Sequence, residues 1–109
     1  YVNIVLGMQY QGAIEATPEC LNSMIEFLPP ECYFNCCATS AGQLPVTTMA
    51  MIRGGAIRVG LEDNIYYSRG VLAKSNAQLV ERSVRIAREL NIEPVSPDEA
   101  RQILGIVKR

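Results

Sequence analysis

Apolar residues fall into short runs along the chain, separated by stretches in which apolar positions recur at helical spacing. Runs rich in β-branched, aromatic or small residues predict strands at residues 2–6, 32–38 and 56–61. Apolar positions three and four residues apart predict helices after Thr17 and over residues 44–53. Strands that alternate with helices predict an α/β fold built around a parallel sheet.

The residues at the predicted helix ends support this division of the chain. Thr17-Pro18 is typical of a helix start and Pro29-Pro30 of a helix stop, because proline suits only the first turn of a helix. Ser75 predicts the cap of a third helix over residues 76–90, and Ser96 predicts the cap of a last short helix. The predicted order of elements is therefore β-α-β-α-β-α-α.

Three repeated βα units leave the predicted sheet unfinished. Residues 62–74 join the third strand to the long helix and are predicted to form a polar loop. A three-stranded parallel sheet has two free edges, whereas parallel sheets are normally covered on both faces. The sheet is therefore expected to be an open sandwich, or to pair with strands from elsewhere in the same protein or from another copy.

Composition narrows the class of protein. The chain has 109 residues, so we expect one domain at most. Apolar residues make up 49% of the chain and charged residues 19%, which is typical of a globular protein. The formal charge of −1 argues against a basic surface for nucleic acid, and no apolar run is long enough to span a membrane. Lys108 and Arg109 are expected to be a solvated end.

The chain has four cysteines and no histidine. The spacing of these cysteines fits no standard zinc pattern, so a metal or redox cluster is less favoured than burial of Cys36 and Cys37 as small apolar residues in a strand. The four cysteines are Cys20, Cys32, Cys36 and Cys37. Reduced cysteines predict a cytoplasmic setting. Without histidine, this chain alone cannot complete a histidine-rich metal site or an imidazole-dependent triad.

Charged residues stand at the end of the third predicted strand. Strand alternation places Arg58 and Glu62 on one face, and Asp63 follows directly. Unpaired charge is costly to bury, so these groups must form ion pairs, bind an ion or line a cavity. One hypothesis is a metal or acid–base site in which Glu62 is an oxygen ligand, Asp63 accepts a proton and Arg58 binds a substrate carboxylate. The alternative is an ion pair of Arg58 with Glu62 or Asp63 that closes the end of the sheet.

Two further groups of residues have less specific patterns. Arg69 and Lys74 could hold an anion in the loop after the third strand, although solvated loop charge is the favoured interpretation. Thr39, Ser40 and Gly42 precede a helix and could donate hydrogen bonds to a phosphate or carboxylate, the alternative being helix capping.

Polar residues elsewhere predict a pocket rim and a solvated helix face. Met8, Gln9 and Gln11 follow the first strand and are interpreted as the rim of a pocket. On the long predicted helix, Arg82 and Arg88 belong to the solvent-facing side, where they would form charge pairs with nearby glutamates.

One stretch is specific enough to indicate a family. The sequence Arg-Val-Gly-Leu-Glu-Asp-Asn at residues 58–64 is followed by Ser-Arg-Gly-Val-Leu-Ala-Lys-Ser-Asn-Ala at residues 68–77. Both stretches resemble the beta-keto acid cleavage enzymes, a family that includes the 3-keto-5-aminohexanoate cleavage enzymes of lysine fermentation. The resemblance continues through residues 85–90 and 96–105, and upstream through residues 43–45.

The resemblance implies a zinc-dependent TIM barrel, of which residues 1–109 would be one incomplete domain holding the last three βα units and the C-terminal helix. Enzymes of this family convert a 3-keto acid and acetyl-CoA into a CoA ester and acetoacetate. Their zinc, a Lewis acid on the keto oxygen, is held by two histidines from an early strand and by a glutamate that corresponds to Glu62. Their catalytic aspartate corresponds to Asp63, and their catalytic arginine corresponds to Arg58.

The sequence also departs from the family pattern. No histidine supplies the zinc pair, so this chain alone is expected to be inactive. Ala56 stands where many relatives have histidine, and residues 38–42 replace a more glycine-rich turn.

The resemblance implies small-molecule partners, namely a beta-keto acid and acetyl-CoA, with no nucleic acid and no membrane. A homo-oligomer is expected, because an exposed parallel edge tends to pair with another strand. The alternative hypothesis is a non-catalytic truncated fragment or assembly module that associates with itself through its open sheet edges.

Overall fold

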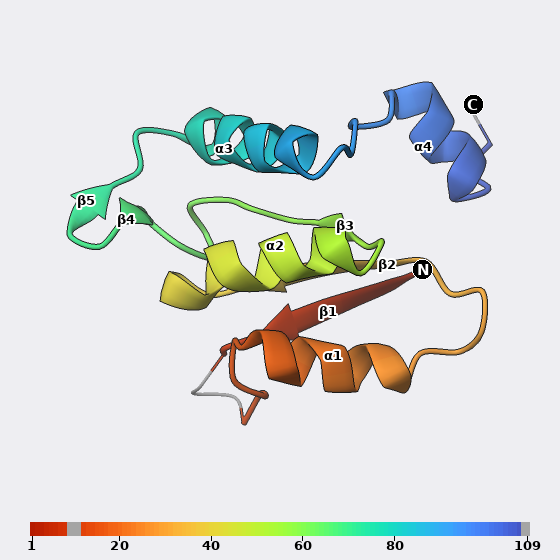
Figure 1. Cartoon of the computed structure of the whole chain (residues 1–109), viewed down its shortest axis with the longest axis horizontal. Helices are drawn as coiled ribbons and strands as arrows, with labels where there is room; N and C mark the ends of the chain where they lie inside the picture. Colours follow the sequence, from red (N-terminus) through yellow and green to blue (C-terminus); the bar gives the residue numbers. More distant parts are fainter. Residues whose placement is uncertain (9–11, 108–109) are drawn as a thin grey trace.

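The three predicted strands form one parallel sheet in the order β1-β2-β3 (Figure 1). The computed structural model describes residues 1–8 and 12–107 of the chain. The predicted α/β class is confirmed, whereas closure into a barrel stays a prediction. In chain order, the elements are β1 (Val2–Leu6), α1 (Pro18–Glu26), β2 (Phe34–Ala38), the 3-10 turn η2 (Ser40–Gly42), α2 (Gln43–Ile52), β3 (Ala56–Ile57), β4 (Tyr66–Ser68), β5 (Val71–Leu72), α3 (Asn76–Glu89) and α4 (Pro97–Ile103).

β1 and β2 pair along their whole length and end together. Leu6 lies opposite Ala38, so both strands reach the same edge of the sheet. Thr39 joins the two ends, because its hydroxyl donates a hydrogen bond to the Gly7 carbonyl at 2.7 Å. This carboxyl edge is where parallel α/β folds usually carry their functional residues.

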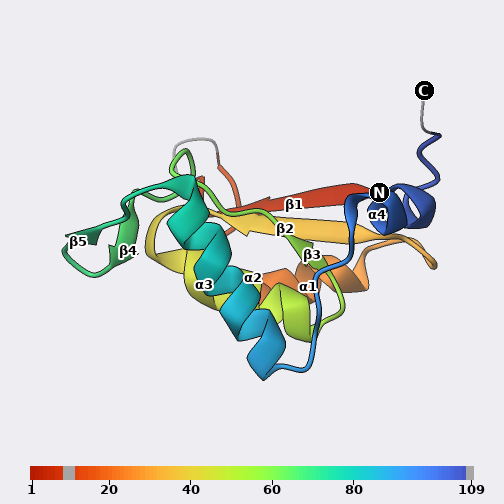
Figure 2. The same ribbon diagram turned by 90° about the horizontal axis from the view of Figure 1, so that it is seen from above.

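The hydrophobic core lies between one face of the sheet and the helices α1 and α2. Alternate residues of β1 and β2 point to this face, among them Leu6 and Cys36, which are 1% and 0% exposed. Leu21 of α1 and Val46 of α2 belong to the same buried cluster. Figure 2 shows α1, α2 and α3 on one side of β1 and β2. The helices therefore cover one face of the sheet.

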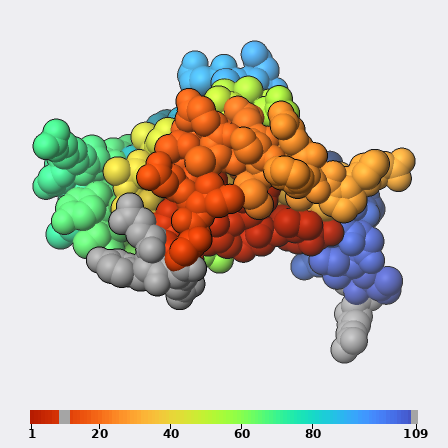
Figure 3. Space-filling view, turned by 90° about the horizontal axis from the view of Figure 1, so that it is seen from below, coloured from red at the N-terminus to blue at the C-terminus, as the bar shows by residue number. Residues whose placement is uncertain are grey.

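The helices α1, α2 and α3 leave the opposite face of the sheet uncovered, although Cys37 on that face is 0% exposed. The residues of β1 and β2 that point there include Val5, Asn35 and Cys37. The side-chain oxygen of Asn35 is buried and has no hydrogen-bond partner among the described residues. β1 forms one edge of the sheet and reaches the surface beside α1 (Figure 3). The sheet of this chain is thus open on one face and at its edges, and whether other strands pair with it stays a prediction.

Side chains cap three helices as predicted. The Thr17 hydroxyl accepts a hydrogen bond at 3.2 Å from a backbone amide in the first turn of α1. The Ser75 hydroxyl accepts from the Gln78 amide at 3.1 Å, and Ser96 forms a capping box with Glu99. The predicted starts of α1, α3 and α4 are therefore confirmed.

The predicted strand over residues 56–61 is wrong beyond its first two residues, because β3 ends at Ile57. After β3 the Gly60 carbonyl accepts hydrogen bonds from the amides of Asp63 and Asn64, which closes a turn. β3 lies at the edge of the described sheet and has β2 alone as a neighbour. Local hydrogen bonds therefore satisfy backbone groups that a longer strand would have left without partners.

The predicted polar loop over residues 62–74 contains a hairpin, so that prediction is also corrected. β4 and β5 pair antiparallel, with Tyr66 opposite Leu72. Gly70 turns the chain with a φ of 76°, a conformation that glycine adopts without strain. β5 has two residues, too few for alternation of apolar and polar positions to reveal a strand.

Some predicted residues lie outside the described part of the chain. They are Gln9 and Gln11 of the predicted pocket rim, and Lys108 and Arg109 of the predicted solvated end. None of the helices that the structure describes is long and apolar enough to cross a lipid bilayer.

All four cysteines are free thiols, and they divide into two classes. Cys20 and Cys32 are partly exposed, whereas Cys36 and Cys37 are buried in β2 as predicted. Burial raises the pKa of Cys36 to about 12, and the neighbouring Cys37 adds to the shift. Because the thiolate is the reactive form, we expect DTNB at mildly alkaline pH to modify two thiols quickly and two slowly. Mass spectrometry of the labelled peptides should identify Cys20 and Cys32 as the fast pair.

The same pKa shift makes stability depend on pH. The pKa of folded Cys36 lies above its ordinary value of 9.0, so the thiol loses its proton more readily in the unfolded chain. Stability is therefore full below pH 9.0 and should fall as the pH rises from there to about 12. Urea midpoints across this range should fall less in Cys36→Ala. An equal fall of the urea midpoint in Cys36→Ala and wild type would contradict this pH dependence. Four thiols that react with DTNB at one common rate would contradict the labelling prediction.

Candidate functional site

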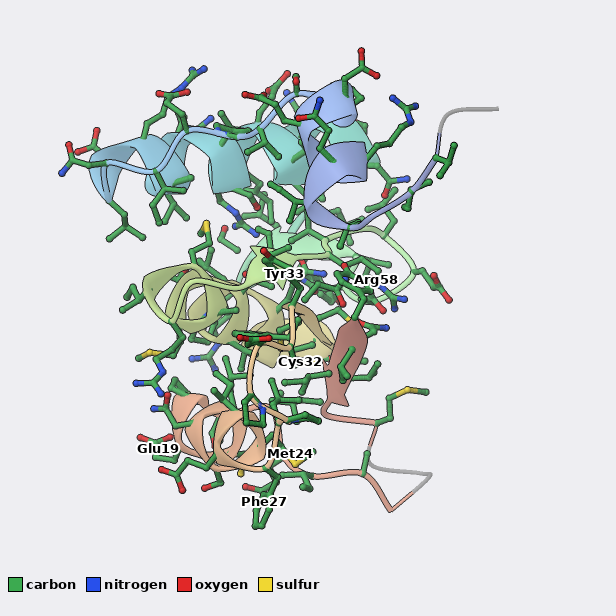
Figure 4. All side chains as sticks on the ribbon, turned by 90° about the vertical axis from the view of Figure 1, so that its right-hand side faces the viewer. Glu19, Met24, Phe27, Cys32, Tyr33 and Arg58 are labelled. Carbon is green, nitrogen blue, oxygen red and sulfur yellow. The ribbon has the colours of Figure 1, made fainter. Side chains whose placement is uncertain are left out.

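Arg58 and Asp63 form a bidentate ion pair at the carboxyl edge of the sheet. The distance from Arg58 Nη2 to Asp63 Oδ1 is 2.7 Å, and that from Nε to Oδ2 is 3.2 Å. The Asp63 side chain is 8% exposed and the Arg58 side chain 42%. Figure 4 shows Arg58 on the side of the sheet away from α1 and α2. Of the two pairings considered for Arg58, the structure forms the one with Asp63 and leaves the guanidinium partly open to solvent.

Glu62 is the remaining member of the predicted site. Its carboxylate is exposed, and it makes no hydrogen bond or ion pair with a described residue. Carboxylate oxygens are common zinc ligands, so Glu62 suits the oxygen-ligand role predicted for it. Within residues 1–8 and 12–107, no group of three or more histidine, cysteine, aspartate or glutamate side chains is placed to hold a metal ion. Glu62 is thus the residue of this site whose oxygens are available to a ligand.

The buried Cys37 thiol shares the electrostatic environment of these charges. Burial raises its pKa, the charge of Arg58 lowers it, and the charges of Asp63 and Glu62 raise it. The hydrogen bond with Asp63 in turn raises the pKa of Arg58. These mutual effects show that the four side chains form one cluster. One cation beside two carboxylates leaves excess negative charge, which favours a cation near Glu62.

The carboxylate turn, residues 60–64, is held by side chains from two helices. At the start of α2, the fully buried Gln43 donates from Nε2 to the Gly60 carbonyl at 3.4 Å. At the start of α3, the Asn76 side-chain oxygen accepts from the Leu61 amide at 2.7 Å. The turn therefore takes its position from helices that the core already fixes.

Two more contacts fix the far end of the carboxylate turn. The Ser40 amide donates to the Asp63 backbone carbonyl at 2.8 Å. The Asn64 side chain bonds both backbone groups of Tyr66, at 2.7 Å to the carbonyl and 3.0 Å from the amide. Because the turn is held at both ends, its backbone and the Asp63 carboxylate are positioned before a ligand arrives, whereas the exposed Glu62 side chain is fixed only through its backbone.

Gln43 and Asn76 are positioning residues that the sequence did not indicate. Gln43 is a polar residue at the start of an otherwise apolar helix, and Asn76 directly follows a helix cap. These sequence positions were the only local hint of a positioning role. The hydrogen-bond partner of each residue lies at least 15 residues away along the chain. Distant partners of this kind cannot be assigned from local sequence.

The anion site considered at Thr39, Ser40 and Gly42 stays a prediction, whereas the capping alternative is wrong for Thr39. Thr39 makes no side-chain cap bond to the following turn. Its hydroxyl donates to Gly7, and the Ser40 amide donates to Asp63. These donors join the strand ends to the carboxylate turn and are already used.

The prediction that Arg82 lies on the solvent-facing side of the long helix is wrong. Its guanidinium carbon lies 4.5 Å above the centre of the Tyr67 ring, and its Nη1 donates to the Tyr67 carbonyl. The Tyr67 hydroxyl accepts from Arg85 at 3.1 Å. Arg88 does face solvent and pairs with Glu93 at 3.3 Å. The hairpin covers the helix at Arg82, which the pattern of the helix alone could not show.

A family model of the beta-keto acid cleavage enzyme matches residues 1–106 of the chain. The chain belongs to the beta-keto acid cleavage enzyme family. The family indicated by residues 58–64 is therefore confirmed.

Relatives within the beta-keto acid cleavage enzyme family are longer than this chain. The 3-keto-5-aminohexanoate cleavage enzymes of Acetoanaerobium sticklandii and Fusobacterium nucleatum are 46% and 42% identical over 108 residues. These matches cover 99% of this chain but 39% and 38% of the relatives. The 3-dehydrocarnitine:acetyl-CoA trimethylamine transferase of Rhizobium meliloti is 35% identical over 95 residues, which is 84% of this chain and 31% of that relative. The chain spans less than half the length of each.

Proposed function

We propose that the chain is the C-terminal part of a zinc-dependent beta-keto acid cleavage enzyme, which converts a 3-keto acid and acetyl-CoA into a CoA ester and acetoacetate. Family membership supports the type of reaction, and the Rhizobium meliloti relative, whose name includes acetyl-CoA, supports the co-substrate. The observation that carries the proposal is the cluster of Arg58, Glu62 and Asp63 at the carboxyl edge of a parallel sheet. That edge is where TIM barrels carry their active sites.

Residues 1–109 would then form one incomplete domain, namely the last three βα units of a TIM barrel and the C-terminal helix. The uncovered face of the sheet supports this arrangement, since it would face the inside of the barrel. The buried and unpartnered oxygen of Asn35 lies on that face, where a barrel interior would supply further side chains.

Arg58 would bind the carboxylate of the 3-keto acid. Its guanidinium is partly exposed and presents a planar set of donors that matches a carboxylate. A substrate carboxylate that reached Arg58 would compete with Asp63 for the same donors. Binding would thus release oxygens of Asp63, so substrate itself would prepare the base.

Asp63 would accept the proton that is removed from the substrate. Its side chain is nearly buried, and its backbone is fixed by the Ser40 amide, so the carboxylate is held in one place. Glu62 would be a zinc ligand, together with two histidines from a part of the barrel outside this chain. Zinc, when bound, supplies Lewis-acid polarisation of the keto oxygen.

A second candidate function is a non-catalytic assembly module. The observation that favours it is exposed apolar surface away from the candidate site: Phe27 is 83% exposed, and β1 has a free edge. Self-association would cover these surfaces without any catalytic role for Glu62. A cytoplasmic homo-oligomer is proposed in either case.

Zinc binding in a reconstituted enzyme tests the proposal. The chain is co-expressed with the N-terminal remainder of the Acetoanaerobium sticklandii relative, and the resulting assembly is called the reconstituted enzyme below. Elemental analysis should find roughly one zinc ion per assembly. Glu62→Gln should weaken zinc binding by more than roughly 100-fold, because even outer-shell partners of a metal contribute 10-fold to 100-fold.

Glu81→Gln is the matched control, since Glu81 is an exposed glutamate of α3 outside the cluster. It should leave zinc content unchanged. An assembly without zinc, or equal zinc content in Glu62→Gln and wild type, would refute the zinc role. A chain that sediments as a complex of its own copies and does not assemble with the remainder would favour the second candidate.

A further inference from the structure

A pocket of about 630 Å³ opens between the start of α2 and the β4–β5 hairpin. Its wall includes Ser40 and Leu44 on one side, Tyr66 and Tyr67 of the hairpin on the other, and Arg82 of α3. Figure 1 shows the hairpin next to the starts of α2 and α3. The pocket is separate from the Arg58–Asp63 ion pair, and the roles proposed above do not use it.

Two positive side chains and no negative one line this pocket. Arg69 and Arg82 both contribute to the wall, and none of the lining residues is an aspartate or a glutamate. A concave surface with charge of one sign raises the local concentration of ligands of the opposite sign. Arg69 is also one of the two loop residues considered for an anion, although solvated loop charge is the favoured interpretation of the sequence. The pocket therefore favours an anionic ligand.

Arg82 is the second positive side chain of the wall, and one of its donors has no partner in the part of the chain that the structure describes. Its Nε is buried and has no hydrogen-bond partner among the described residues, although its Nη1 donates to the Tyr67 carbonyl. A buried arginine donor without an acceptor is unfavourable. Because Nε has no access to solvent, a phosphate in the pocket would bind the outer part of the guanidinium or draw the side chain outward, and planar guanidinium groups match phosphate well.

The rest of the wall suits a ligand larger than a simple anion. A pocket of about 630 Å³ has room beyond a single phosphate or carboxylate. Tyr66 and Tyr67 add aromatic rings, and Tyr66 is 46% exposed. Aromatic rings are the usual surfaces on which nucleotide bases stack.

We propose that this pocket binds the phosphate-bearing nucleotide end of CoA, with Arg69 and Arg82 facing its phosphates. The inference rests on the proposed function, which supplies acetyl-CoA as the co-substrate. It goes further by assigning residues to a ligand end that the carboxylate cluster does not contact.

The pocket adjoins the carboxylate turn, which places it within reach of the proposed chemistry. Asn64 lines the pocket and directly follows Asp63 in the chain. Ser40 also lines the pocket, and its amide donates to the Asp63 carbonyl at 2.8 Å. A CoA molecule anchored by its nucleotide would extend its thioester arm along the carboxyl edge toward Asp63.

Binding of CoA to the 109-residue chain tests the pocket without zinc, keto acid or turnover. Calorimetric titrations compare CoA, dephospho-CoA and pantetheine, which carry successively fewer phosphates. CoA should bind most tightly, and its affinity should fall as salt rises. Arg69→Ala should weaken CoA binding by roughly 10-fold to 100-fold, as expected for loss of one charged hydrogen-bond partner, and leave any pantetheine binding unchanged.

Arg88→Ala is the control, because Arg88 is an exposed arginine of α3 that lies outside the pocket. Arg82→Lys complements Arg69→Ala, since it keeps the charge but loses the planar guanidinium, and it should weaken CoA binding at temperatures where circular dichroism shows that the variant is folded. Equal CoA affinity in Arg69→Ala and wild type, or no CoA binding by the wild-type chain, would overturn the pocket. If Glu62→Gln loses zinc but Arg69→Ala leaves CoA affinity unchanged, the pocket assignment alone is overturned. If Arg69→Ala weakens CoA binding but Glu62→Gln keeps its zinc, the proposed zinc chemistry alone is overturned.

Discussion

Replacement of Asp63 by asparagine should lower kcat of the reconstituted enzyme by roughly 100-fold to 10,000-fold, the range typical for loss of a general base. Asparagine has nearly the same shape, so the Ser40 amide can still donate to the backbone carbonyl at this position. The charge is what changes, because the amide side chain neither accepts the substrate proton nor neutralises Arg58. We expect zinc content and melting temperature to stay close to the wild-type values while turnover falls.

Asp98→Asn makes the same chemical change away from the cluster. The Asp98 side chain is 68% exposed and pairs with Arg101 at 2.8 Å on α4, so its loss should leave kcat nearly unchanged. An Asp63→Asn variant with wild-type kcat would remove Asp63 from the mechanism. If the fall in kcat is fully explained by a lower melting temperature, the Arg58–Asp63 pair is a structural contact and not part of the mechanism.

The helix starts and the first two strands could be predicted because their determinants are local. Thr17, Ser75 and Ser96 each cap a helix with an amide three residues along the chain. β1 and β2 lie side by side with one face in the core, and their apolar runs show it. Short-range hydrogen bonds and burial can therefore be predicted from the capping residues and apolar runs of the sequence.

The end of β3 and the hairpin could not be predicted because neighbours decide them. Residues 58–61 have strand-like alternation, yet β3 has a partner on one side alone among the described strands. The hairpin in turn covers Arg82, a residue whose helical position alone indicates solvent. A wrong prediction for one element, here the hairpin, therefore also gives a wrong prediction for the side chains that contact it.

The sequence located the charged cluster but left its pairing open. Arg58 could reach Glu62 or Asp63 in an extended strand or a turn. The turn at Gly60, held by Gln43 and Asn76, decides in favour of Asp63 and leaves the Glu62 oxygens without a partner among the residues that the structure describes. Contacts made by residues distant in the sequence thus separate the base from the proposed metal ligand.

Gly42→Ala should lower the free energy of unfolding by about 3 kcal/mol, in the upper part of the range for overpacked sites. Gly42 has an ordinary φ of −70°, so backbone conformation is not the cause. An added Cβ would lie 2.3 Å from the Ala16 Cβ and 2.8 Å from the Ala16 carbonyl oxygen. Backbone atoms cannot move aside as a flexible side chain can, so α2 would shift away from the segment before α1.

Urea unfolding of matched variants separates the effect of this clash from the loss of stability that a glycine-to-alanine substitution causes without a clash. Gly54→Ala has open space around the new methyl group but a φ of 78°, so it should cost about 1 kcal/mol. Adding Ala16→Gly to Gly42→Ala removes the contact between the two Cβ atoms and should restore part of the lost stability. Equal destabilisation in Gly42→Ala and Gly54→Ala, or no recovery in the double variant, would contradict the clash.

The position of Gly42 connects this packing to the candidate site. Ser40 and Gln43 lie on either side of it, and they hold the carboxylate turn through the Asp63 and Gly60 carbonyls. A shift of α2 would therefore move both supports of the Asp63 carboxylate. We expect Gly42→Ala to lower kcat of the reconstituted enzyme by more than the loss of folded protein explains, whereas Gly54→Ala should lower activity only in proportion to unfolding.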